Sequence, residues 1–378
     1  MRKAIAKKED HLKEIARVFL KLGFTGFGGP AVHIAMMEEE IVRKRQWLTH
    51  EHFIDLIGAT NLIPGPNSTE MAIHLGHERG GWRGLLIAGA CFILPAVFIT
   101  AVIAWAYQQY GHLPVVEPFF YGIKPAIIGV IVSLMITLGR KALKSIELGI
   151  IGIICALLAL FHFNEVAILF GAGIIGMGIY AIKQKRHANK VASLIPVLLL
   201  QTHINSSGWK VFWTFLKIGS ILYGSGYVLF AFLDDELVKQ GILSRQTLID
   251  AIAVGQFTPG PVFSSATFIG WQIGGWQSAA AATLGIFMPS FVFVAFLNPL
   301  VNRLRKSKIT SAFLDAVNIA AIALILGICA EMGKDSITDW KTIFIAIAGF
   351  AITLSFKKVN SAFVVLGGAV LGYLLYLI

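Results

Sequence analysis

Two glycine- and proline-rich motifs interrupt segments that are otherwise apolar enough to form helices. The first is Gly28-Gly29-Pro30, and the second runs from residue 64 to residue 66. A helix that restarts after such a break offers free backbone N–H groups and the positive end of its dipole, and both favour an anion. Amide and hydroxyl side chains at residues 67–69 add hydrogen-bond donors. The motifs therefore predict an anion-binding site.

No motif for a catalytic nucleophile, a nucleotide or a set of metal ligands accompanies these breaks. We therefore expect that the protein is not an enzyme and that it holds neither a cofactor nor a metal. Any pumping driven by ATP would require a second subunit.

The elements that must position the motifs are those of a membrane protein. Of the 378 residues, 56% are apolar and 14% are charged, and the mean hydropathy is +0.73. Uncharged runs such as 84–116 and 251–302 reach the length of a spanning helix, about 17 to 25 residues. The formal charge of +11 fits basic loops on the cytoplasmic side of a bilayer, and we expect no binding of nucleic acid.

The chain contains an internal repeat. The segment that starts at Phe19 resembles the segment that starts at Phe215, an offset of 215 − 19 = 196 residues. The Pro-Gly-Pro sequence of residues 64–66 recurs at 259–261. We divide the chain into an N-terminal repeat (1–182), a basic linker with a short crossing helix (183–208) and a C-terminal repeat (209–378).

Each repeat is expected to contain two broken-helix hairpins followed by four longer apolar segments. The pieces that flank the breaks are about 10 to 14 residues long, which suits re-entrant half-helices better than full spans. The four longer segments of the first repeat lie near 84–108, 119–139, 146–161 and 164–182.

The charges of the loops indicate that the second repeat is inverted relative to the first. Basic residues at 302–308 and 357–358 occupy loops whose first-repeat equivalents are uncharged. By the positive-inside rule, the N-terminus is then cytoplasmic and the C-terminus lies outside, with Val191–Ile204 as the crossing between the repeats. The expected fold is an all-α polytopic membrane protein with two inverted-topology repeats, an architecture typical of secondary transporters.

A lysine precedes the first break of each repeat at the same position, and an ammonium group inside an apolar helix must face a cavity or a counter-charge. Irregular backbone survives in a membrane only where protein buries it or where it lines a polar cavity, so we expect the four breaks to line one cavity. Substrate binding is therefore assigned to these residues: Lys21, Gly28, Gly29, Pro30, Asn61, Pro64, Gly65, Pro66, Asn67, Ser68, Thr69, Lys217, Gly224, Ser225, Gly226, Pro259, Gly260, Pro261, Ser264 and Ser265.

Two further ionisable residues are candidates for coupling or for ion pairs. Glu70 follows the second break, where it either couples a proton or pairs with a lysine such as Lys21; the pairing is the favoured interpretation. Lys124 is a second candidate cation of the cavity. The acidic triplets at 38–40 and 234–236 are expected at the membrane interface.

The segments "GFTGFGGP" and "NLIPGPNSTE", together with a degenerate second copy that ends in "TPGP", resemble the long, two-domain form of the chromate ion transporter family. The resemblance covers residues 13 to 378. It implies a bacterial inner-membrane permease that expels chromate, with sulfate as a related or competing oxyanion. In the second copy the first motif has become Gly224-Ser225-Gly226, so the two halves need not be equivalent.

Three functions remain open from the sequence. The leading one is chromate export driven by the membrane potential or by protons. The others are a permease for sulfate or another inorganic anion, and a membrane scaffold in which the glycines only permit close helix packing. Because both halves lie in one chain, a monomer could suffice, and a homodimer is left open.

Overall fold

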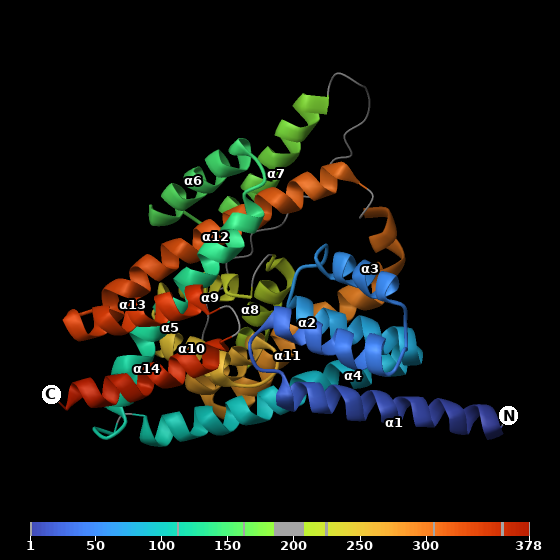
Figure 1. The fold of residues 1–378 in the computed structure, drawn as a ribbon, viewed down its shortest axis with the longest axis horizontal. Coiled ribbons are helices and arrows are strands. Elements are labelled where there is room, and N and C mark those ends of the chain that lie inside the picture. Colours follow the sequence, from blue (N-terminus) through green and yellow to red (C-terminus); the bar gives the residue numbers. More distant parts are fainter. Residues whose placement is uncertain are drawn as a thin grey trace.

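The computed structural model describes residues 2–111, 113–161, 163–184, 208–223, 226–304, 307–356 and 359–377. Within these ranges every regular element is a helix, as the sequence predicts (Figure 1). The predicted crossing helix Val191–Ile204 and nearly all of the linker lie outside the described residues. Gly224, Ser225 and the basic pairs at 305–306 and 357–358 also lie outside them.

The helices follow the same order in the two halves of the chain. The elements of the first half are α1 (Arg2–Thr25), α2 (Pro30–Met37), the π-helical turn η1 (Glu38–Lys44), α3 (His50–Thr60), α4 (Asn67–Tyr110), α5 (Glu117–Ala142), α6 (Ile146–Leu160) and α7 (Glu165–Gln184). Those of the second half are α8 (Gly208–Ile221), α9 (Val228–Leu233), the π-helical turn η2 (Asp234–Val238), α10 (Arg245–Phe257), the 3₁₀ turn η3 (Val262–Ser264), α11 (Ser265–Leu304), α12 (Lys308–Ser336), α13 (Trp340–Ser355) and α14 (Ser361–Tyr376).

Five helical segments of the described chain are long and apolar enough to cross a membrane: Asn67–Tyr110, Glu117–Ala142, Glu165–Lys183, Val262–Phe296 and Lys308–Ser336. Large apolar side chains on their surfaces, such as Phe98 at 69% exposure and Ile174 at 64%, are exposed in the isolated chain and suit contact with lipid. The protein is therefore a multi-pass membrane protein. Of the pieces expected to be about 10 to 14 residues long, α3 has 11 residues and α10 has 13. Helices α2 and α9 are shorter, with 8 and 6 residues, because a π-helical turn follows each of them. Helix α1 is 24 residues long, because its charged N-terminal part continues the helix.

The N-terminal part of α4, residues 67–80, folds back on the rest of that helix at Gly81. Gly81 has φ 60° and ψ −148°, a conformation that a residue with a Cβ adopts only under strain. A Cβ placed on Gly84 would lie 2.1 Å from the carbonyl oxygen of Gly76, and one on Gly89 would lie 2.9 Å from Ile73. The chain thus forms a helical hairpin, with a half-helix of residues 67–80 packed against a longer arm.

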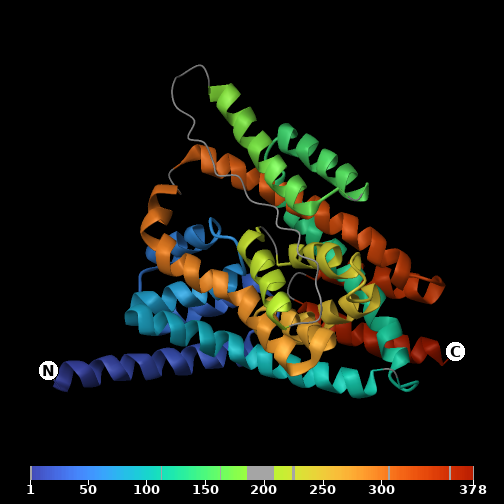
Figure 2. The same ribbon diagram turned by 180° about the vertical axis from the view of Figure 1, so that it is seen from behind.

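The second half of the molecule repeats this hairpin in α11. Gly275 has φ 67° and ψ −157°, and a Cβ on Gly270 would lie 2.4 Å from the carbonyl oxygen of Ser278. The hydroxyls of Thr267 and Thr283 meet across this hairpin at 2.8 Å. Figures 1 and 2 show that the long arm of α4 runs from the N-terminal side of the molecule towards the C-terminal side, whereas the long arm of α11 runs the opposite way.

The last two helices of each half pack against a helix of the other half, the one that follows the hairpin. Helices α13 and α14 lie on α5, while α6 and α7 lie on α12 (Figure 1). Small residues permit this close approach: a Cβ on Gly122 of α5 would lie 2.0 Å from the carbonyl oxygen of Gly368 in α14. The two halves are therefore interlocked, and the four broken segments lie between them.

Candidate functional site

Two backbone hydrogen bonds run between the repeats and join their breaks in two pairs. The N–H of Gly65 donates to the carbonyl oxygen of Leu222 at 2.8 Å, and the N–H of Gly260 donates to that of Gly26 at 2.7 Å. Each Pro-Gly-Pro segment thus bonds to the end of the first broken helix of the other repeat. The bonds join the four breaks in two pairs, and the expectation that all four line one cavity stays a prediction.

Glycine is required at both donor positions, 65 and 260, because of the backbone conformation and the close neighbouring atoms. Gly65 has φ 133° and Gly260 has φ 89°. A Cβ on Gly65 would lie 2.5 Å from Oε1 of Glu70 and 2.8 Å from the hydroxyl of Ser290. A Cβ on Gly260 would lie 2.9 Å from the side chain of Ala96. The Pro-Gly-Pro motifs are thus fixed parts of a packed centre.

The first repeat carries a polar bridge at this centre that the second repeat lacks. His33 lies 2.9 Å from the carbonyl oxygen of Gly26 through Nε2 and 3.2 Å from the hydroxyl of Ser68 through Nδ1. The ring is 1% exposed. The equivalent positions of the second repeat are Leu229 and Phe263, so the two halves of the centre differ in chemistry.

A buried carboxyl group, that of Glu70, lies one helical turn after the Pro-Gly-Pro of the first repeat. The residue is fully buried, and the hydroxyl of Ser290 donates to Oε1 at 3.4 Å. Among the described residues, no group donates to its Oε2, and the hydroxyls of Thr69 and Ser265 also have no partner. Buried polar atoms without partners are rare and mark places where a proton, a water molecule or a ligand can be held. Such a set fits a transport site.

Each of the two repeated lysines forms an ion pair with the last residue of the acidic triplet in its own repeat. Lys21 Nζ lies 2.7 Å from Oε1 of Glu40, and Lys217 Nζ lies 2.5 Å from Oε1 of Glu236. The favoured prediction, a pair between Glu70 and Lys21, is therefore wrong, because the partner of Lys21 is Glu40. The expected counter-charge exists, but it comes from the triplet.

The last residue of each acidic triplet is buried in the protein: Glu40 is 6% exposed and Glu236 is 8% exposed. The expected place of the triplets at the membrane interface stays a prediction. Lys44 and Arg45 also contact Glu40. The hydrogen bond from Lys21, aided by these two cations, lowers the pKa of the Glu40 carboxyl to about 2 in spite of its burial. The group is charged at every physiological pH.

The remaining predicted residues occupy defined places around the centre. Asn67 begins α4 and donates through Nδ2 to Oδ1 of Asn61 at 2.8 Å. Ser264 accepts a hydrogen bond from the hydroxyl of Thr100 at 3.3 Å. A Cβ on Gly226 would lie 3.4 Å from the ring of Phe263, whereas one on Gly29 would meet nothing within 4 Å.

Lys124 lies in an ion pair rather than alone. Its Nζ is 3.5 Å from Oδ1 of Asp250 and donates to Oε1 of Gln246 at 2.7 Å. Asp250, which the sequence-based assignment omits, also accepts a hydrogen bond from the hydroxyl of Tyr107 at 2.7 Å. This cluster ties α10 of the second half to α4 and α5 of the first.

The residues that sequence reasoning missed are the partners: Glu40, Glu236, Ser290, Asp250 and His33. The sequence does contain a signal for the two lysine–glutamate pairs, because in each repeat the glutamate lies 19 residues after the lysine. For Ser290, no local pattern points to Glu70, since the two residues are 220 positions apart.

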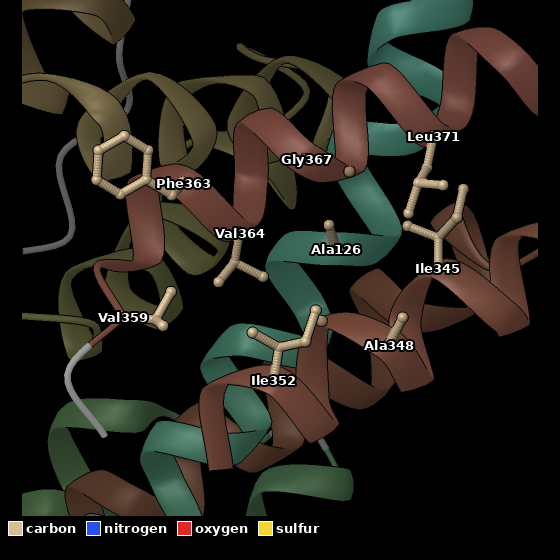
Figure 3. A pocket seen from close by; sticks show the side chains of 11 residues that line it. Ala126, Ile345, Ala348, Ile352, Val359, Phe363, Val364, Gly367 and Leu371 are labelled. Atoms are coloured by element: carbon tan, nitrogen blue, oxygen red, sulfur yellow. The ribbon is translucent and has the colours of Figure 1, made fainter. Parts of the chain in front are cut away.

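An apolar cavity of about 140 Å³ lies between α5, α13 and α14 (Figure 3). Its lining residues include Ala126, Ile345, Val364 and Leu371, and Figure 3 shows only apolar side chains turned towards it. Such a lining offers no hydrogen-bond donor to an oxyanion. The cavity therefore is not the anion site.

Long apolar helices, two interlocked copies of one element order and broken helices joined at the centre define a class: the multi-pass membrane transporter built from repeats. Comparison with known proteins narrows the class. The profile of the chromate transporter family matches residues 13–177 and again residues 209–373, and the chain belongs to that family.

Curated relatives resemble this chain over nearly its whole length. It is 29% identical over 374 residues to the chromate transport protein of Cupriavidus metallidurans, which covers 97% of this chain and 93% of the relative. It is 28% identical to the probable chromate transport protein of Synechococcus elongatus, covering 97% and 96%, and 26% identical to the chromate transport protein of Pseudomonas aeruginosa, covering 95% and 91%. No solved structure matches the chain.

Proposed function

We propose that this protein exports chromate from the cytoplasm across a bacterial inner membrane, with its N-terminus cytoplasmic and its C-terminus outside. The names of the curated relatives support the substrate. The observation that carries a transport mechanism is the crossed pair of hydrogen bonds, Gly65 to Leu222 and Gly260 to Gly26. These bonds connect the broken helices of the two halves, so a movement of one half is transmitted to the other.

The membrane potential supplies a driving force for this direction. A dianion that leaves a cell with a negative interior gains about 2.3 kcal/mol per charge for each 100 mV. Export then needs no other energy source. The opposite orientations of the long arms of α4 and α11 support the inverted topology that alternating access in such repeats requires.

Proton coupling through Glu70 is a second candidate mechanism, favoured by one observation. The carboxyl group is fully buried, and its Oε2 has no partner within the described chain. A carboxyl in such a place can take up a proton in one conformation and release it in another. Replacing it with glutamine would leave potential-driven flux intact and abolish any dependence on a pH gradient.

Sulfate is the alternative substrate, because it shares the charge and the tetrahedral shape of chromate. Uptake of sulfate would run against the potential and would need coupled cations. A scaffold without transport activity does not agree with membership of a transporter family.

The test is flux in vesicles that contain the purified full chain. Labelled chromate and sulfate are measured under an imposed potential, for the wild type and for Lys21→Ala and Lys217→Ala. We expect chromate flux that follows the potential, and a fall of about tenfold or more in Lys217→Ala, since its partner Glu236 becomes an unpaired buried charge. Lys141→Ala, at the exposed end of α5, is the control. Flux that ignores the potential would contradict potential-driven export, and unchanged flux in both lysine variants would contradict the site.

A further inference from the structure

The N-termini of two helices from different halves of the chain lie close together. Helix α2 begins at Pro30, directly after Gly28 and Gly29, and helix α14 begins at Ser361 with Asn360 as its N-cap. A Cβ placed on Gly28 would lie 3.5 Å from Nδ2 of Asn360. Two positive dipole ends therefore face the same small region.

The backbone donors of the first break are unused. Among the described residues, no acceptor is found for the N–H groups of Gly28 and Gly29, and no side chain caps α2. A side chain on Gly29 would meet nothing within 4 Å, so there is open space in front of these groups. Asn360 uses its Oδ1 to accept from the N–H of Ala362 at 3.0 Å, which leaves its Nδ2 as a further donor.

A buried amide with an unused donor lies beside the first residue of α14. Gln256, in the last turn of α10, is 5% exposed. Its Oε1 accepts from the hydroxyl of Tyr227 at 3.1 Å and from that of Ser361, the first residue of α14, at 3.3 Å. Its Nε2 has no partner in the described part of the chain. A buried N–H₂ group without an acceptor is costly, so a missing acceptor is indicated.

The repeat-equivalent positions differ in chemistry from those at α14. Ser361 corresponds to Glu165, which begins α7 and pairs with Lys239 at 3.2 Å, so a side chain of the protein itself occupies that helix N-terminus. The amide equivalent to Gln256 is Asn61. Its Oδ1 accepts from Nδ2 of Asn67, and the residue is exposed, so water can solvate its N–H₂ group. Of these two amides, Gln256 is the one whose N–H₂ group is buried without an acceptor in the described part of the chain.

We propose that Gln256 Nε2, Asn360 Nδ2 and the N–H groups of Gly28 and Gly29 form a binding subsite for a tetrahedral divalent oxyanion. The inference rests on the proposed function in that the anion is taken to be the transported one. The subsite binds through neutral donors and helix dipoles, so the anion is held without a permanent counter-charge and can leave when the half-helices move. Gln256 and Asn360 belong to the second repeat and the glycines to the first, so the substrate itself would join the halves.

The test is equilibrium binding of radiolabelled chromate and of radiolabelled sulfate to the purified full chain in detergent. Gln256→Glu keeps the acceptor for Tyr227 and Ser361 but replaces the donor with a carboxylate. Asn360→Asp keeps the N-cap of α14 and removes its donor. Each should weaken binding about tenfold or more, as expected for the loss of a hydrogen bond to a charged ligand.

A matched control adds the same charge elsewhere. Gln108→Glu keeps the acceptor for the indole N–H of Trp271, 2.9 Å away, and should leave affinity unchanged. Melting curves of all variants verify that the fold is retained, and Asn360→Asp serves if Gln256→Glu does not fold. Weakened binding of one anion or of both supports the subsite and tells which oxyanion it takes.

The two hypotheses fail in distinguishable ways. If the wild type binds and transports chromate and both variants bind as tightly as it does, the subsite is overturned while chromate export stands. If the wild type neither binds nor moves either oxyanion, both the subsite and the proposed function are overturned.

Discussion

At the scale of single residues, the two lysine–glutamate pairs have different surroundings. Lys21 is 56% exposed, and its partner Glu40 has Lys44 and Arg45 as further cations. Lys217 is 26% exposed and is the one cation recorded near Glu236 within the described chain. Removing the lysine therefore leaves a compensated carboxylate in the first repeat and an uncompensated one in the second.

This asymmetry predicts unequal costs for the same substitution. Lys21→Met should lower the free energy of unfolding by about 1 kcal/mol or less, because the lysine is exposed and Glu40 keeps Lys44 and Arg45 as partners. Lys217→Met should lower it by about 3 kcal/mol, as for a buried carboxylate that loses its partner. Thermal unfolding of the purified variants measures both, and the double variant Lys217→Met, Glu236→Gln should recover part of the loss. Equal shifts in the two single variants would contradict the assigned surroundings.

The pKa of Glu40 predicts how the first pair responds to pH. The folded-state pKa, about 2, is lower than the ordinary value of 4.5, so the stabilisation is complete above about pH 5 and is lost as the pH falls towards 2. The difference in melting temperature between the wild type and Glu40→Gln should therefore be constant from pH 8 to about pH 5.5. Below about pH 4.5 the difference should shrink. A difference that changes near neutral pH would show that another group is responsible.

At the scale of elements, the breaks in the helices could be predicted from Gly and Pro, but the packing around them could not. Helices α2 and α4 begin at the Gly-Gly-Pro and Pro-Gly-Pro motifs, because a missing N–H and a positive φ are local properties. The turn at Gly81 also has a local signal, the Gly80-Gly81 pair just before the apolar segment that starts near residue 84. The contact of Gly76 with Gly84, which closes the hairpin, depends on tertiary packing and has no local signal.

The reversal predicts an intolerance to any side chain at two glycines. Gly81→Ala and Gly275→Ala should each destabilise the protein by about 1 to 3 kcal/mol, because both have a positive φ and neither has a crowding neighbour, so only backbone strain is tested. Gly178→Ala, within α7 and also without a neighbour inside 4 Å, is the matched control. It should be neutral or slightly stabilising, because alanine favours a helix. Yields of folded protein and melting temperatures provide the measurement.

At the scale of the whole molecule, the sequence predicts the repeat. It does not predict that helices of each copy pack against a helix of the other copy. An offset of 196 residues is visible in the chain, whereas the packing of α6 and α7 on α12, and of α13 and α14 on α5, depends on contacts between distant segments. The crossed bonds from Gly65 and Gly260 are likewise invisible in the motifs that contain them. Glycines on α5 are necessary for this close packing between the copies, but a glycine does not indicate which helix will pack against it.

The proposed inversion of the second repeat predicts opposite accessibility for equivalent hairpin tips. Arg83 and Gln277 are exposed and follow the reversals at Gly81 and Gly275 by the same number of residues. In a background that lacks the native cysteines, a cysteine at Arg83 should react with an impermeant thiol reagent from the cytoplasmic side, as should cysteines at Lys183 and Ser307. A cysteine at Gln277 should react from the outside only, because the proposed inversion, argued from the positively charged loops, puts this tip on the other side of the membrane. Labelling of both tips from one side would mean that the repeats are parallel, and a mechanism that moves two inverted halves past a shared anion would then fail.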